Sequence, residues 1–182
     1  GAIMSLSAYL LFAFFSMMGL NYIFAAFLTI IASIFLVLLS NYLVYKPLRK
    51  RKATPTIMLI ASVVLLIFTS SLIIAFFGSS TKTIGFRSKT FDFGAFTITS
   101  LQISIIVFAI LLFLLLWILL KKTKLGKAMR ALADNKDVAQ IVGINPEKIY
   151  NYTFIIAAVL GAFGGMLLGR EQNLYPRMGI LI

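Results

Sequence analysis

The charged residues are spaced so that they divide the chain into long apolar windows. A helix needs about 20 apolar residues to cross a bilayer, and five windows approach or exceed this length. They are Ile3–Leu20, Tyr22–Tyr45, Thr56–Gly78, Leu101–Leu120 and Ile149–Gly169. The first two form one uncharged run that is too long for a single crossing, and we expect the chain to turn at Gly19-Leu20-Asn21. The pattern predicts an all-α fold, a polytopic transmembrane helical bundle with five spans in one domain.

The basic residues between these windows are distributed unevenly. The segments Lys46–Lys52 and Lys121–Lys148 hold twelve of the 17 lysines and arginines, and the other five follow the third and fifth windows. Cytoplasmic loops of membrane proteins carry an excess of Lys and Arg. The asymmetry therefore predicts that both basic segments are cytoplasmic and that Ser79–Ser100 is external.

The segment Ser79–Ser100 also has a pattern of its own. Phe91-Asp92-Phe93 and Phe96–Thr99 are rich in strand-forming residues, and Gly94 between them suits a turn. We expect a short hairpin here. An external lid or a docking surface for another protein is the functional alternative.

The amino-acid composition argues against most classes of catalytic and ion-coupled function. The hydrophobic fraction is 61%, mean hydropathy is +1.03, and the chain has no cysteine and no histidine. The apolar windows contain no Asp, Glu, Lys or Arg, which argues against a proton relay, a voltage sensor or an intramembrane protease. No phosphate-binding loop is present, so any nucleotide would be bound by another chain. We therefore expect no catalytic, cofactor or metal site and no enzyme activity. The net charge of +12 reflects loops beside a membrane rather than nucleic-acid binding.

The fifth window carries a stripe of small residues at intervals of four. Its members are Ala157, Gly161, Gly165 and Gly169. Such stripes let helix backbones approach closely in lipid. We predict a helix-packing face here, with a pore-lining role as the alternative.

The segment Lys121–Lys148 is patterned rather than loop-like. Asp134 is expected to cap a short helix with Asp137 as its third residue, as in a capping box. An apolar face follows, made by Val138, Ile141 and Val142. Gly143 is placed to end the helix in a left-handed conformation, and Asn145 to cap the next helix with Pro146 as its first residue. This short helix is either a docking element for a partner or a solvated helix at the membrane surface.

These residues resemble the permeases of branched-chain amino-acid ABC importers. The resemblance is carried by Thr123–Ala131, Ala139, Gly143-Ile144-Asn145 and Thr153-Phe154, and by Tyr45–Arg51 and the opening Gly1–Met4. Asp137–Gly143 is also similar to the importer docking motif Glu-Ala-Ala-x-x-x-Gly, with Asp in place of Glu and Val in place of the first Ala. The later part of that motif, Ile-x-Leu-Pro, has no match in Thr153–Ile156.

The resemblance implies a membrane permease subunit that moves branched-chain amino acids across the bacterial inner membrane. It implies two ATP-binding subunits, a second related permease and an external solute-binding protein as partners, and further spans before Gly1 and after Ile182. The implied ATPase-docking residues are Asp134, Asp137, Val138, Ala139, Ile141, Val142, Gly143 and Asn145, with Ala139 as the close-contact position. The alternatives are a urea or short-amide permease of the same family and a non-transporting membrane anchor subunit.

Overall fold

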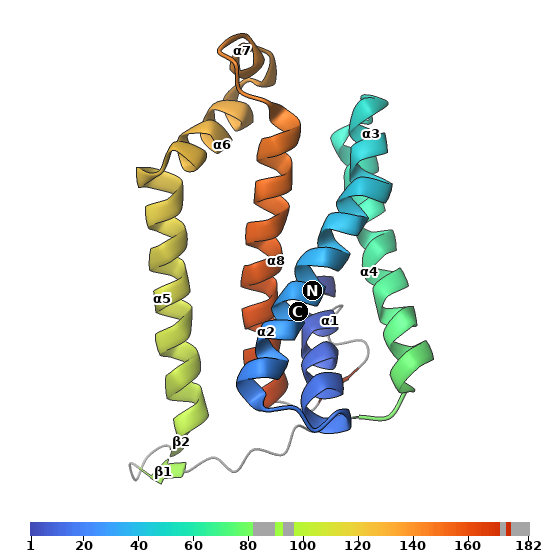
Figure 1. Cartoon of the computed structure of the whole chain (residues 1–182), viewed down its shortest axis with the longest axis vertical. Coiled ribbons are helices and arrows are strands. Elements are labelled where there is room, and N and C mark those ends of the chain that lie inside the picture. The colour runs from blue at the N-terminus through green and yellow to red at the C-terminus, as the bar shows by residue number, and fades with distance from the viewer. Residues whose placement is uncertain (82–89, 93–96, 172–173, 176–182) are drawn as a thin grey trace. The chain divides into compact units, whose positions relative to one another are not determined.

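In the residues that it describes, the computed structural model consists of helices and one short pair of strands (Figure 1). It describes residues 1–81, 90–92, 97–171 and 174–175. Two compact units are present: the first comprises Gly1–Phe86 with Ala157–Ile182, and the second comprises Arg87–Ile156. The first unit contains α1 (Ala2–Phe12), η1 (Ala13–Met17), α2 (Tyr22–Ser40), η2 (Asn41–Tyr45), α3 (Lys46–Lys50) and α4 (Pro55–Phe77). The second contains β1 (Thr90–Asp92), β2 (Thr97–Thr99), α5 (Ser100–Lys122), α6 (Lys124–Asp134) and α7 (Lys136–Ile141). The last helix, α8 (Pro146–Glu171), has its first part in the second unit and its remainder in the first.

Four helical stretches in the described chain are long and apolar enough to span a membrane. They are Tyr22–Lys50, Pro55–Phe77, Ser100–Lys122 and Pro146–Arg170. The predicted first span is shorter, because α1 and η1 together cover only Ala2–Met17. The all-α bundle is confirmed, with four helices of spanning length and one shorter apolar helix where five spans were expected.

The first apolar run turns where the sequence predicted. Gly19 has a φ of 66°, and the side-chain oxygen of Asn21 accepts a hydrogen bond from the Ile23 amide at 3.3 Å, which begins α2. A residue with positive φ cannot continue a right-handed helix. The turn therefore separates η1, which ends at Met17, from α2, which begins at Tyr22.

The second helix extends beyond its predicted end at Tyr45. Helix α2 continues through the π-helical turn η2 into α3, which ends at Lys50. Pro47 has no amide hydrogen, and in a regular α-helix its ring would clash with the carbonyl four residues earlier. The wider π turn directly before it relieves this clash, so the helix continues through a proline that we expected to lie in a loop.

The predicted hairpin is confirmed for its described strands. Strands β1 and β2 pair in antiparallel register, with Thr90 opposite Thr99 and Asp92 opposite Thr97. The connecting residues 93–96, including the expected turn glycine, lie outside the described residues. Thr99 then forms a capping box with Gln102 that begins α5.

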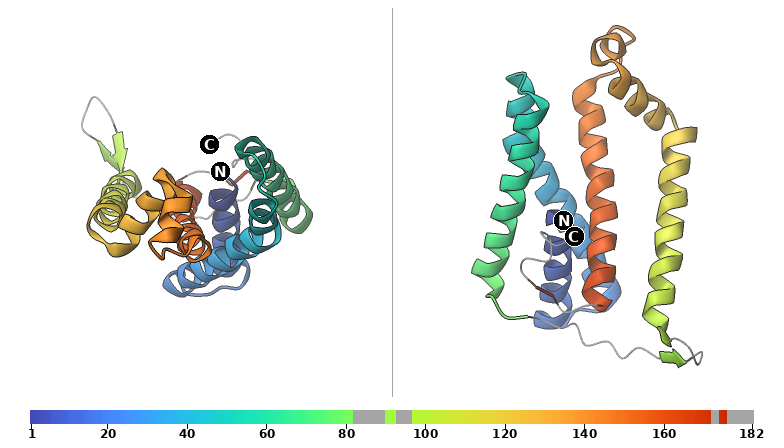
Figure 2. Two further views of the ribbon diagram at one scale, coloured as in Figure 1. Left: turned by 90° about the horizontal axis from the view of Figure 1, so that it is seen from above. Right: turned by 180° about the vertical axis from the view of Figure 1, so that it is seen from behind.

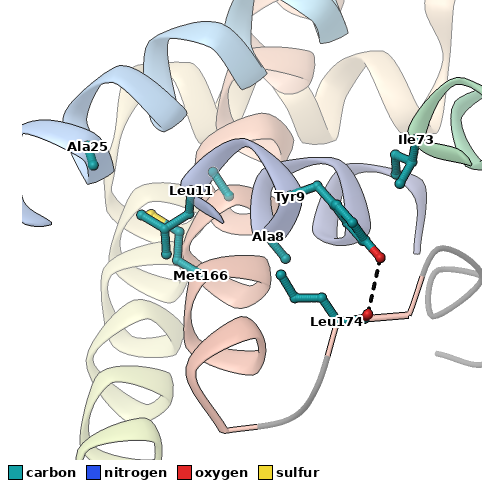
Figure 3. Close-up of a cluster of buried hydrophobic side chains, with 8 residues drawn as sticks. Ala8, Tyr9, Leu11, Ala25, Ile73, Met166 and Leu174 are labelled. Carbon is teal, nitrogen blue, oxygen red and sulfur yellow. Dashed lines mark hydrogen bonds between the residues drawn. The ribbon is translucent and has the colours of Figure 1, made fainter. Parts of the chain in front are cut away.

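Helix α1 forms the centre of the first unit. It packs against both α2 and α4 (Figure 2). Its buried side chains Ala8, Tyr9 and Leu11 join Ala25 of α2, Ile73 of α4, Ala162 and Met166 of α8, and Leu174 (Figure 3). The Tyr9 hydroxyl donates a hydrogen bond to the Leu174 carbonyl at 3.1 Å. Burying this polar tip is inexpensive because it has a partner.

Helix α5 of the second unit is exposed, in contrast to α1 with its buried side chains. None of its residues is buried in the described structure, although its side chains are apolar on every side. Phe113 and Leu115, for example, are 66% and 55% exposed. A helix that is hydrophobic all round requires lipid or other helices around it.

Candidate functional site

The connection from α5 to α6 is a tight helical corner built by one threonine and one glycine. The Thr123 hydroxyl accepts a hydrogen bond from the Gly126 amide at 3.0 Å and donates one to the Leu119 carbonyl at 2.5 Å. A Cβ atom added to Gly126 would overlap the carbonyl oxygens of Leu119 and Leu120. Gly126 lies within the segment that resembles the importer family, but the sequence did not show that it allows close approach of the two helices at this corner.

Helix α6 was not anticipated from the sequence, which predicted one short helix in this segment where the structure has two. Its apolar positions Leu125, Met129 and Leu132 recur at helical intervals, and Leu132 is buried. Lys124, Lys127 and Arg130 are exposed on the other side. This i, i+4, i+7 spacing is the signal that would have identified the helix.

The cap of α7 differs from the prediction. Asn135, and not Asp134, is the N-cap, because its side-chain oxygen accepts from the amides of Asp137 and Val138 at 3.0 and 3.1 Å. Asp134 is instead the last residue of α6, and the Asn135 amide still donates to the Ala131 carbonyl at 3.1 Å. Adjacent Asp and Asn side chains have similar capping ability, and the extent of α6 decides between them. Asp137 is therefore the second residue of α7 rather than the third.

The side chains of α7 and the residue after it divide into one buried position and three exposed apolar positions. Ala139, the close-contact position that the family resemblance implied, is 3% exposed, so its methyl group packs within the chain rather than at the surface. Val138, Ile141 and Val142 are 53%, 86% and 74% exposed and form what we call the α7 surface. Such exposure is costly for apolar side chains in water, and adjacent exposed residues of this type mark interaction sites.

The end of α7 and the start of α8 follow the sequence prediction. Gly143 has a φ of 87°, in the left-handed region, and the Ile144 amide donates to the Ala139 carbonyl at 2.9 Å. The Asn145 side chain then accepts from the amides of Glu147 and Lys148 at 3.0 and 3.3 Å, with Pro146 as the first residue of α8. The α7 surface is thus held between two defined caps.

The second candidate region is the part of α8 that belongs to the first unit. We define the glycine face as Gly161, Gly165 and Gly169, which lie against α1. An added Cβ would overlap the Ile3 side chain at Gly161 and the Met4 carbonyl and Ser7 hydroxyl at Gly165. At Gly169 it would lie 3.3 Å from the Ala8 Cβ.

The backbones come close enough in this region for a polar contact between the helices. The Ser7 hydroxyl lies 3.3 Å from the Gly161 carbonyl. Ala157, the fourth residue of the predicted stripe, is exposed and takes no part, whereas Ala158 and Ala162 are buried.

A further set of buried polar residues follows one side of the helix that starts at Tyr22, and it was not singled out in the sequence. Thr29, Ser33 and Asn41 are each at most 2% exposed. The Thr29 hydroxyl donates to the Ala25 carbonyl at 2.8 Å, and the Asn41 side chain accepts from the Arg49 guanidinium at 2.9 Å. Recurrence at multiples of four was the available signal. Among the described residues, no three His, Cys, Asp or Glu side chains are grouped in a way that could hold a metal ion.

Comparison with known families identifies the chain. A sequence model described as "Branched-chain amino acid transport system / permease component" matches residues 1–181. The chain belongs to this permease family. With its long apolar helices, it is a multi-pass membrane protein.

Individual relatives of the permease point to more than one type of transport system. The chain is 33% identical to the "Probable branched-chain amino acid transport permease protein LivH" of Methanocaldococcus jannaschii, over 79% of this chain and 47% of the relative. It is also 33% identical to the LivH permease protein of Escherichia coli, over 47% of this chain and 28% of that protein. The galactose/methyl galactoside import permease MglC of Escherichia coli is 30% identical, over 70% of this chain and 39% of that protein. The chain thus spans half or less of the length of these relatives. No solved structure matches it.

Proposed function

We propose that the chain is part of a membrane permease subunit of an ABC importer and that it moves branched-chain amino acids. The observation that carries this proposal is the family match over residues 1–181. The ATP would be hydrolysed by partner subunits, because the chain itself has no phosphate-binding loop.

The α7 surface supports a mechanical role for the segment between α5 and α8. Val138, Ile141 and Val142 project from a short helix whose two ends are capped. We propose that this surface docks in an apolar groove of an ATP-binding subunit, the helix-in-groove mode of recognition. Movement of that subunit would then act on α8 through Gly143 and Asn145. Ala139 would support the docking helix from inside, since its side chain is buried.

The remaining partners follow from the proposed import system. We propose a second related permease subunit, two ATP-binding subunits and an external solute-binding protein, assembled in the cytoplasmic membrane. Lys46–Lys52 and Lys121–Lys148 would face the cytoplasm, where Lys and Arg are in excess. The hairpin of β1 and β2 would lie outside, as a structural element or a surface for the binding protein.

Uncharged spans suit a cargo without net charge. The apolar windows contain no Asp, Glu, Lys or Arg, and leucine, isoleucine and valine are zwitterions. A sugar is a second candidate cargo, because the MglC relative is named as a galactose/methyl galactoside import permease. The alternatives from the sequence analysis are a urea or short-amide cargo and a membrane anchor that transports nothing.

Uptake by the reconstituted complex tests these candidates together. The complete permease would be assembled with its partner subunits in liposomes, with ATP inside and labelled leucine outside. We expect ATP-dependent leucine uptake that unlabelled isoleucine and valine suppress, while galactose and urea in excess leave it unchanged. Suppression by galactose alone would assign a sugar cargo instead. ATP hydrolysis without movement of any of these solutes would favour the anchor.

A further inference from the structure

Lys46–Lys52 forms a concentrated positive charge that has no counter-charge nearby in the sequence. Five of its seven residues are Lys or Arg, and no Asp or Glu occurs anywhere between Gly1 and Phe86. We call this segment the basic turn. Lys50, Arg51 and Lys52 are exposed. A carboxylate side chain that pairs with these cations would therefore have to come from outside this part of the chain.

The helix that carries the basic turn is longer than a bilayer interior is thick. The stretch Tyr22–Lys50 is 29 residues long, whereas about 20 residues span the roughly 30 Å hydrocarbon layer. The apolar helix α2, with 19 residues, nearly accounts for that thickness. If α2 fills the hydrocarbon layer, η2 and α3 extend into the layer of lipid headgroups.

Two contacts organise the side chains at this level. The Arg49 guanidinium donates to the side-chain oxygen of Asn41 at 2.9 Å, and Asn41 is 2% exposed. The buried amide therefore orients the guanidinium at the point where the apolar helix ends. The Lys46 ammonium lies 5.0 Å from the ring centre of Tyr42, which is 64% exposed. Tyrosine is enriched at this depth in membrane proteins because its ring is apolar and its hydroxyl polar.

We propose that the basic turn binds the phosphate groups of anionic phospholipids. Guanidinium and ammonium groups form charge-assisted hydrogen bonds with phosphate oxygens, and a juxtamembrane cluster of this size attracts anionic lipid. The oriented Arg49 and the Lys46–Tyr42 pair would fix a headgroup beside the helix, and the exposed lysines would supply additional attraction. A soluble phosphate compound shares this chemistry, and an acidic protein is a different class of partner. We favour lipid because the helix itself carries the charges to headgroup depth.

The test is lipid binding to the full chain purified in a non-ionic detergent. Spin-labelled phosphatidylglycerol would be compared with spin-labelled phosphatidylcholine, and glycerol phosphate would be the soluble competitor. We expect phosphatidylglycerol to bind at least tenfold more tightly, and Lys50→Gln with Lys52→Gln to remove about tenfold of that affinity. Asn41→Leu keeps every cation but removes the hydrogen bond that Asn41 accepts from Arg49, and we expect a loss of about threefold. The matched control is Lys124→Gln with Lys127→Gln, which removes two exposed cations from α6 and should leave the affinity unchanged.

Several results would overturn the proposal. If the two lipids bound equally, the basic turn would have no preference for anionic lipid. If the α6 control lost as much affinity for phosphatidylglycerol as the Lys50 and Lys52 variant, the attraction would come from positive charge in general and not from the basic turn. Competition by glycerol phosphate at concentrations comparable to the lipid would identify a soluble phosphate ligand. If the Lys50 and Lys52 variant bound phosphatidylglycerol normally but lost a co-purifying protein, the partner would be acidic protein instead.

Discussion

The glycine face of α8 and the α7 surface make opposite use of small and apolar residues. At the glycine face, missing side chains let α8 approach α1, so that Gly165 lies directly over the Met4 carbonyl. On the α7 surface, valine and isoleucine side chains remain exposed, with Ile141 at 86%. The glycine face is thus covered by α1, whereas the α7 surface is not covered by any part of the described chain. We therefore expect substitutions on α8 to affect folding, and substitutions on the α7 surface to affect association.

Among the substitutions that test this difference, we expect Gly165→Leu to have the largest effect. In Gly165→Leu the new side chain would overlap backbone as well as the Ser7 hydroxyl, and backbone cannot rotate away. Overpacking of this kind costs about 1–3 kcal/mol and occasionally more, and we expect the variant to lose most of its folded protein. Monodisperse yield on size-exclusion chromatography measures the effect.

Ala157→Leu is the matched control for Gly165→Leu. It adds volume to the same helix at an exposed position, and its yield should equal that of the unmodified chain. Equal yields of both leucine variants would mean that α8 does not need close approach to α1.

The corner at Gly126 should give the next largest effect. Gly126→Val places a branched side chain against the carbonyls of Leu119 and Leu120, so α6 must move away from the end of α5. We expect faster proteolytic cleavage between α5 and α6, because the displaced backbone is open to protease. Lys127→Val, at the adjacent exposed position of α6, controls for the new residue type. A cleavage pattern unchanged in Gly126→Val would remove the packing argument for this corner.

Charge on the α7 surface should separate association from folding. We expect Ile141→Glu to fold normally but to reduce co-purification with the ATP-binding subunit, and uptake with it, about tenfold, as for the loss of a central interface contact. Gln140→Glu introduces the same charge at an exposed polar position of α7 and should retain both properties. Ala139→Glu should differ from both by losing folded protein, since that methyl group is buried. Full retention of the ATP-binding subunit by Ile141→Glu would contradict docking through this surface.

The smallest effect is expected at Gly143, which joins α7 to α8. Its φ of 87° costs a residue with a side chain about 1–2 kcal/mol. Gly143→Val should therefore lower the thermal midpoint of the purified protein modestly. Gly143→Asn should lower it less, because asparagine tolerates left-handed conformations. Equal midpoints for glycine, asparagine and valine would show that the turn relaxes without strain.

Sequence alone determined the class of the protein and several local features. Lipid as a solvent follows from uncharged windows, because charge inside a bilayer is costly. The turn near Gly19, the hairpin strands, the left-handed Gly143 and the Asn145 cap were also predictable, since each depends on a few neighbouring residues. The same is true of the family, whose resemblance is carried by short runs of neighbouring residues such as Thr123–Ala131.

Other features depend on how far each helix extends and on which element packs against it, and only the tertiary structure determined these. The N-cap of α7 is Asn135 rather than Asp134 because α6, which the sequence did not predict, extends through Asp134. Ala157 and Gly165 belong to one sequence stripe, yet only Gly165 meets α1, since a helix turn faces its neighbour over a limited length. Ala139 and Ile141 are both apolar, and only packing made one buried and the other exposed. Periodicity defines the face of a helix, and the partner that covers that face is a property of the folded chain.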